Sequence, residues 1–170
     1  MNAFDILCFR QKLEEDTDNR EYRRRFHENY EWLDGYCRSR WVADQDNAIF
    51  KFSKKFGEYY WHNVSEIPAL SKRMGELGPV GSSRKPNYEP TQEIVRATIL
   101  LRSEDSKPIQ KFRAMIELVR QIRNNLFHGK KMELNELPVY ERNKNLVQLG
   151  AEITNVLLNH LEEAERNIGS

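Results

Sequence analysis

The sequence has little cysteine, glycine or proline, and each shortage excludes a class of protein. Cys8 and Cys37 are the only two cysteines in 170 residues. Neither has a second cysteine nearby, so the spacing indicates neither a disulfide-bonded scaffold nor a zinc site. Eight glycines and six prolines are few for an all-β fold, which needs many tight turns. The isolated thiols favour a reducing, cytoplasmic location.

Long hydrophobic runs are also missing. No segment approaches the roughly 18 consecutive apolar residues of a membrane span. The first apolar run, over residues 3–9, is interrupted by Asp5 and is too short for the apolar region of a signal peptide. We therefore expect no membrane association and a cytoplasmic protein.

Neither sign of charge is in excess. Lys and Arg number 27 and Asp and Glu number 26, which gives a net charge of +1. This balance excludes a protein that coats nucleic acid by bulk charge, and a polybasic membrane binder. The eight Phe, seven Tyr and three Trp residues argue against disorder of the whole chain. The length fits one domain, over residues 1–170.

Most of the sequence has the spacing of amphipathic helices. Apolar side chains recur at steps of three and four in Tyr22–Cys37, in Ile49–Tyr60 and in Thr91–Arg102, which predicts a helix over each range. A shorter helix is expected at 66–76. Residues 77–90 are rich in Gly, Pro and Ser and predict a loop.

The clearest helix follows Ser106, the predicted N-cap, and has Pro108 in its first turn, where a missing N–H is tolerated. Its apolar stripe runs over 109–126, and Gly129 is expected to end it. A last long helix is expected from Pro138 to Ala164. The strand signal is weak throughout. The sequence therefore predicts an all-α fold, a helical bundle of about five main helices with a loop elaboration near 77–90.

The familiar catalytic signatures are mostly absent. The chain has no G-x-S-x-G elbow, no H-E-x-x-H, no Walker loop and no G-x-G-x-x-G. His27 and Glu28 are interpreted as a surface pair on a helix, His62 as a packed or interfacial imidazole, and His160 as a core histidine. We therefore expect no bound metal and no cofactor.

One segment, Arg120 to Lys131, concentrates residues suited to phosphate chemistry. Arg123 precedes His128 by five positions, and Asn124 follows the arginine directly. Arginine offers a forked, permanently charged donor to phosphate oxygens, and histidine transfers protons near neutral pH. Residues 107–131 contain seven Lys or Arg and one Glu, a net of +6, which leaves −5 on the rest of the chain. This local field favours a phosphate backbone as ligand.

The segment resembles the R-x4–6-H motif of the HEPN superfamily, many of whose members are ribonucleases. The matching residues are Arg123, Asn124 and His128. The resemblance implies a HEPN-like helical domain over 1–170, a homodimer, and metal-independent cleavage of RNA that leaves 2′,3′-cyclic phosphate and 5′-hydroxyl ends. It also implies a toxin, defence or RNA-processing role, with a possible antitoxin or regulatory partner.

Under this interpretation Arg123 neutralises the scissile phosphate, His128 transfers protons, and Asn124 orients His128 or holds the phosphate. On a regular helix, residues five positions apart are separated by about 140°, so Arg123 and His128 do not share a face. A composite site built from two protomers would relax that constraint. Three further basic side chains are predicted to bind the RNA backbone: Arg120, Lys130 and Lys131.

Two alternatives stay open. One is a non-catalytic HEPN-type module that binds RNA, nucleotides or a protein partner. The other is a structural helical dimer in which Arg123 and His128 satisfy buried carbonyls or pair with acids. The eleven aromatic residues between Phe26 and Trp61 are predicted to form core or dimer interface rather than to stack on bases. The arginines at 23–25 are predicted to lie on a solvated helix face.

Overall fold

The computed structural model describes residues 2–78, 80–82, 89–127 and 137–168. None of these residues lies in a strand, so the all-α prediction is confirmed. The described ranges form eight α-helices and one 3-10 helix: α1 (Ala3–Glu15), α2 (Thr17–Arg40), η1 (Val42–Asn47), α3 (Ala48–Asn63), α4 (Glu66–Leu77), α5 (Gln92–Arg102), α6 (Pro108–Phe127), α7 (Leu137–Asn159) and α8 (Leu161–Ile168).

The described ranges contain more helices than the sequence predicts, for two local reasons. At α1, the Asn2 side chain accepts the Asp5 N–H at 2.9 Å and the Asp5 carboxylate accepts the Asn2 N–H at 3.0 Å. This capping box starts a helix whose apolar stripe is weak. At the other end, the predicted last helix is interrupted at His160, and the separate α8 buries Ala164.

The start of α6 also differs from the prediction by one residue. The carbonyl of Lys107 accepts the first hydrogen bond of the helix, from the Lys111 N–H at 3.1 Å. The Lys107 N–H in turn donates to the Gln110 side chain at 2.8 Å. Lys107, rather than Ser106, is therefore the N-cap, and Pro108 is the first helical residue.

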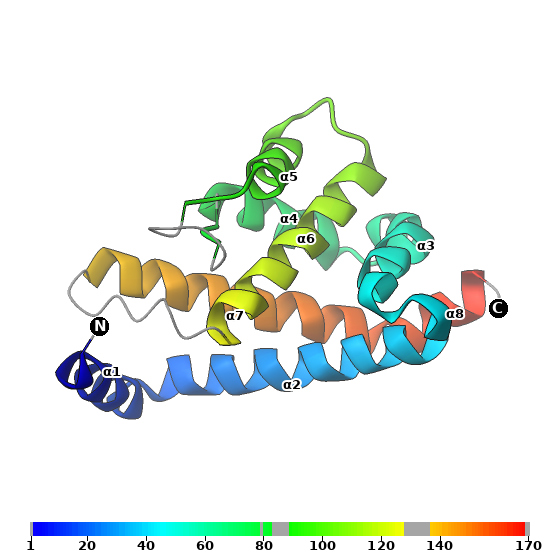
Figure 1. The fold of residues 1–170 in the computed structure, drawn as a ribbon. Coiled ribbons are helices and arrows are strands. Elements are labelled where there is room, and N and C mark those ends of the chain that lie inside the picture. The colour runs from blue at the N-terminus through cyan, green and yellow to red at the C-terminus, as the bar shows by residue number, and fades with distance from the viewer. Residues whose placement is uncertain (1, 79, 83–88, 128–136, 169–170) are drawn as a thin grey trace.

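The two longest helices, α2 and α7, lie side by side and run in the same direction (Figure 1). At their N-terminal ends, Asn19 donates to the Tyr140 hydroxyl at 3.0 Å, and Tyr140 donates to Asp16 at 2.8 Å. Further along, the Phe26 ring packs against Gly150. The pair forms one long layer, and α6 crosses it (Figure 1).

Helix α6 lies at the centre of the core. Its predicted apolar stripe is confirmed, since Phe112, Met115 and Val119 are all fully buried. Phe112 stacks on Tyr60 of α3 with ring centroids 5.7 Å apart, and the Tyr60 hydroxyl donates to the Leu157 carbonyl of α7 at 2.6 Å. The core therefore joins α6 to both α3 and α7.

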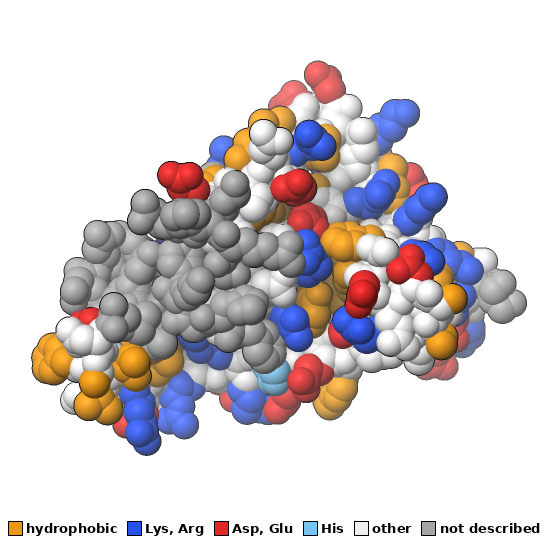
Figure 2. All heavy atoms as spheres, in the orientation of Figure 1, with side chains coloured by type: hydrophobic (Ala, Val, Ile, Leu, Met, Phe, Trp, Pro, Cys, Tyr) orange, Lys and Arg blue, Asp and Glu red, His pale blue; other side chains and the backbone are white. Residues whose placement is uncertain are grey.

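The aromatic residues between Phe26 and Trp61 contribute largely to this core, as predicted. Five of them are buried: Phe26, Tyr30, Phe52, Phe56 and Tyr60. Trp32, by contrast, is 66% exposed, and α1 exposes Phe4 and Leu7. Hydrophobic side chains accordingly gather over α1 at the left of Figure 2.

Residues 78, 80–82 and 89–91 are non-helical, in agreement with the predicted loop. Val80 and Ser82 are nevertheless buried, so this part of the loop packs against the helices. None of the described helices is both long and apolar enough to cross a membrane.

Candidate functional site

Arg123 lies near the end of α6, where this helix meets α2. Its guanidinium carbon is 5.2 Å from the centre of the Tyr30 ring, and its Nη1 donates to the Asn124 side chain at 3.4 Å. Arg123 is half-buried and Tyr30 is only 5% exposed. A guanidinium packed on a rigid, buried ring is attracted by the ring electrons and restricted in its motion. Arg123 is therefore held in place while part of its side chain remains accessible.

Tyr30 was not singled out by the sequence as a site residue. Burial raises the pKa of its hydroxyl to about 12; the charge of Asp34 adds to this shift, and Arg123 and Arg120 oppose it. The hydroxyl therefore stays protonated near neutral pH and is not a proton acceptor there. Tyr30 therefore contributes to the candidate site through its ring, the platform on which the Arg123 guanidinium packs.

Arg120 lies one turn before Arg123 and contacts a different helix. Its guanidinium is 5.1 Å from the centre of the Phe50 ring of α3. It also forms an ion pair with Glu117 at 3.0 Å, and both side chains are largely buried. The charge of Arg120 is thus already partly compensated within α6. Because Glu117 precedes Arg120 by three positions on a predicted helix, the sequence itself indicates this ion pair.

The two consecutive asparagines of the motif face different surroundings. Asn124 is half-buried beside Arg123. Asn125 is buried, and its amide donates to the Gly81 carbonyl at 2.7 Å. Asn125 therefore ties residues 80–82 to the end of α6. In the sequence, Asn125 follows the apolar Ile122 by three positions. This spacing places a polar side chain on the buried face of the helix, which indicates a structural hydrogen bond.

We expect Asn125→Ala to lower the free energy of unfolding by about 1–3 kcal/mol, because the buried Gly81 carbonyl loses its hydrogen-bond donor. Urea denaturation followed by circular dichroism measures this change. Asn155→Ala, at an exposed position of α7, is the matched control and should change stability by less than about 0.5 kcal/mol. Equal stability of the two variants would contradict a structural role for Asn125.

The remaining predicted site residues, His128, Lys130 and Lys131, lie outside the described residues, as does Gly129. The described part of the candidate site is thus its arginine half, Arg123 and Asn124. Within the described ranges, no group of three or more His, Cys, Asp or Glu side chains is arranged to hold a metal ion.

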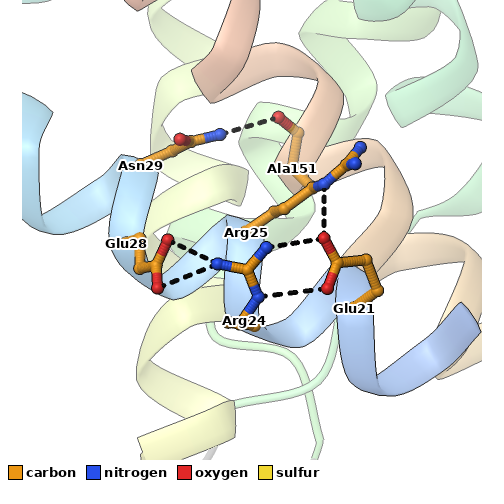
Figure 3. Close-up of polar contacts among 6 residues, drawn as sticks. All are labelled: Glu21, Arg24, Arg25, Glu28, Asn29 and Ala151. Atoms are coloured by element: carbon orange, nitrogen blue, oxygen red, sulfur yellow. Dashed lines mark hydrogen bonds and ion pairs between the residues drawn. The ribbon is translucent and has the colours of Figure 1, made fainter. Parts of the chain in front are cut away.

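The arginines at 23–25 divide into two kinds. Arg24 donates to Glu21 at 2.6 Å and to Glu28 at 2.9 Å, and Arg25 shares Glu21 at 2.9 Å (Figure 3). Hydrogen bonds from Arg24 and then Arg25 lower the pKa of Glu21 to about 2. Because Arg24 and Arg25 are exposed and paired, the prediction of a solvated helix face is confirmed for these two residues.

Arg23 is different, because its side chain is half-buried and packs 5.4 Å from the centre of the Phe9 ring. Its buried Nε meets no hydrogen-bond acceptor among the described residues. Arg23, His27 and Tyr30 are spaced four and three residues apart, so they share one face of α2. A second partly buried cation therefore lies on the same face of α2 as the platform for Arg123.

The described histidines make local contacts. His27 lies 3.3 Å from Glu31, one turn along α2. His62 is exposed and 3.1 Å from Glu58, so within this chain it is not a packed imidazole. His160 is half-buried at the junction of α7 and α8 rather than in the core. The contacts of His27 and His62 thus lie within one turn of their own helices, whereas the position of His160 depends on the break between α7 and α8.

Comparison of the chain with protein-family models, with curated proteins and with solved structures finds no match. The described geometry offers a fixed guanidinium beside an amide, which together can hold a phosphate oxygen.

Proposed function

We propose that the protein is a metal-independent endoribonuclease of the HEPN type. The observation that supports this most is the restrained position of Arg123, half-buried over Tyr30 and bonded to Asn124, five residues before His128. An arginine fixed in this way is ready to neutralise a phosphorane without reorganising. The net charge of +6 over residues 107–131 favours binding of the RNA backbone at the same place.

In the proposed reaction, the ribose 2′-hydroxyl loses its proton to a base and attacks the adjacent phosphorus. The bond from phosphorus to the 5′-oxygen then breaks, and that oxygen takes a proton from an acid. The products are a 2′,3′-cyclic phosphate and a 5′-hydroxyl, so no water is consumed. His128 performs one proton transfer, Arg123 stabilises the charge on phosphorus, and Asn124 orients His128 or holds the phosphate.

The proposed enzyme is a homodimer. The reaction needs one group to accept a proton and another to donate one, but each protomer has a single motif histidine, His128. The second copy would bring its own Arg123 and His128 to a shared site, with Lys130 and Lys131 holding the RNA backbone. The proposal thus comprises a cytoplasmic, single-domain HEPN-like bundle, acting as a toxin, a defence protein or an RNA-processing enzyme. Exposed apolar side chains, such as Phe4 and Trp32, are suited to contacts between copies.

The test is cleavage of a mixed-sequence RNA in the presence of EDTA. We expect the wild type to cut and to leave cyclic phosphate ends, and His128→Ala to lower kcat by at least about 100-fold, since a proton-transfer group is lost. His62→Ala is the matched control, because His62 is exposed and paired with Glu58. A requirement for Mg²⁺, or full activity in His128→Ala, would show that the proposed mechanism is wrong.

A non-catalytic RNA-binding module is the second candidate. One observation favours it: the described part of the candidate site is a guanidinium beside an amide, Arg123 and Asn124, which can hold a phosphate oxygen but supply no group for proton transfer. Retention of RNA by the wild type without any product, at high protein concentration and with varied substrates, would support this candidate over the enzyme.

A further inference from the structure

A groove of about 500 Å³ runs between α5 and α6. Its floor is apolar and is formed by Ala97 and Leu100 of α5 and Ala114 of α6, with Phe50 of α3 alongside. Arg96 and Arg113 also line the groove, and both are exposed. An apolar floor flanked by guanidinium groups suits a ligand that is both flat and anionic.

The two arginines have unused binding capacity. No hydrogen bond or ion pair joins Arg96 or Arg113 to any described residue. The groove also contains two carboxylates, Glu93 and Glu117, and the second is paired with Arg120 at 3.0 Å. An incoming anion therefore meets two unpaired guanidinium groups, each able to hold a phosphate through two parallel hydrogen bonds.

The groove leads towards the candidate site. Arg113, Glu117 and Arg120 are separated by four and three residues and all line the groove, so they mark one face of α6. Arg120, packed over Phe50 at one end of this face, is one turn before Arg123. A strand that followed this face of α6 would reach the arginine that we assign to the scissile phosphate.

We propose that the α5–α6 groove binds a single strand of RNA next to the position of cleavage. This inference rests on the proposed function. Arg96 and Arg113 hold successive phosphates, and unpaired bases lie on the floor of Ala97, Leu100 and Ala114. In a duplex the bases are stacked inside the helix, so an apolar floor has nothing to contact. The groove therefore selects single-stranded over double-stranded RNA.

Binding is measured by fluorescence anisotropy with the full chain and a labelled 2′-O-methyl oligouridine of about 12 nucleotides. This probe cannot be cut, because it lacks the nucleophilic hydroxyl. We expect the double variant Arg96→Ala/Arg113→Ala to weaken binding at least tenfold. The slope of log K against log salt should fall by about 1.4, since each lost phosphate contact removes about 0.7 for single strands.

Lys54→Ala/Lys55→Ala is the matched control, since it removes the same charge from exposed positions of α3 and should leave binding nearly unchanged. Equal losses in the two double variants would show that only net charge matters and would overturn the groove. Equal binding of an oligouridine–oligoadenosine duplex would overturn strand selection. Binding of polyglutamate in place of RNA would instead identify an acidic protein partner and overturn the proposal.

Cleavage assays separate this inference from the proposed function. If the groove variant raises KM for a short RNA with kcat nearly unchanged, both stand. If RNA is cut with the same KM by wild type and groove variant, the groove proposal fails and the ribonuclease stands. If the oligonucleotide binds in an Arg96- and Arg113-dependent way but no RNA is ever cut, the groove stands and the ribonuclease fails.

Discussion

Replacing Gly150 with alanine is expected to destabilise the protein by about 1–3 kcal/mol. A Cβ at this position would lie 2.5, 2.8 and 2.9 Å from three atoms of the Phe26 ring. Phe26 is completely buried between α2 and its neighbours, so its ring cannot turn away without displacing the core. Gly150 therefore sets how closely α2 and α7 approach each other.

Gly35→Ala provides the matched control within α2, where an added Cβ would meet no atom within 4 Å. In an exposed helix interior, alanine is favoured over glycine by up to about 1 kcal/mol, so this variant should be slightly more stable than the wild type. Opposite signs for the two substitutions, measured by urea denaturation, are the expected result. Stabilisation by Gly150→Ala would show that α2 and α7 do not pack as described.

The conservative substitution Arg123→Lys is expected to lower kcat for RNA cleavage by at least about 100-fold, nearly as much as Arg123→Ala. A lysine keeps the positive charge but loses the planar fork and the stacking on the Tyr30 ring. The phosphate would then meet a mobile point charge in place of a fixed pair of donors. Single-turnover cleavage in EDTA measures the effect, and circular dichroism checks that the variant is folded.

The contribution of the Tyr30 platform is tested by two variants of that residue. Tyr30→Phe keeps the ring and should retain activity within a few-fold, because a hydroxyl with a pKa of about 12 transfers no proton at neutral pH. Tyr30→Leu removes the ring and should lower kcat more than it raises KM. Near wild-type cleavage by Arg123→Lys, or by Tyr30→Leu, would show that charge alone is needed at this position.

The helices of this protein were largely predictable, because burial on one side leaves apolar residues at steps of three and four, as in α3 and α6. The helix pairing was not predictable. The bonds of Asn19 and Asp16 to Tyr140 join residues more than a hundred positions apart, and no local pattern encodes them. Likewise α1 depends on a capping box rather than on an apolar stripe.

The candidate site shows the same division between local and distant information. Arg123 and Asn124 could be selected from their own neighbours in sequence, and the pairing of Arg120 with Glu117 was also readable there. Tyr30 could not be selected, because it comes from α2 and meets Arg123 only when α6 crosses that helix. The groove depends on the packing of α5 against α6, so Arg96 and Arg113 were not distinguishable from other surface arginines.

The parallel course of α2 and α7 has a consequence for biosynthesis. Neighbouring helices in a bundle that run antiparallel can join through a short loop and pair as soon as both are made. Here the whole of residues 41–136 separates the end of α2 from the start of α7. While the ribosome is still synthesising the middle of the chain, α3 can cover part of the apolar face of α2, where Tyr36 meets Phe52, but Phe26 still lacks its contact with Gly150 of α7. Complete burial of this face therefore waits until α7 has been made, which lengthens the time during which the exposed apolar surface of the nascent chain can aggregate.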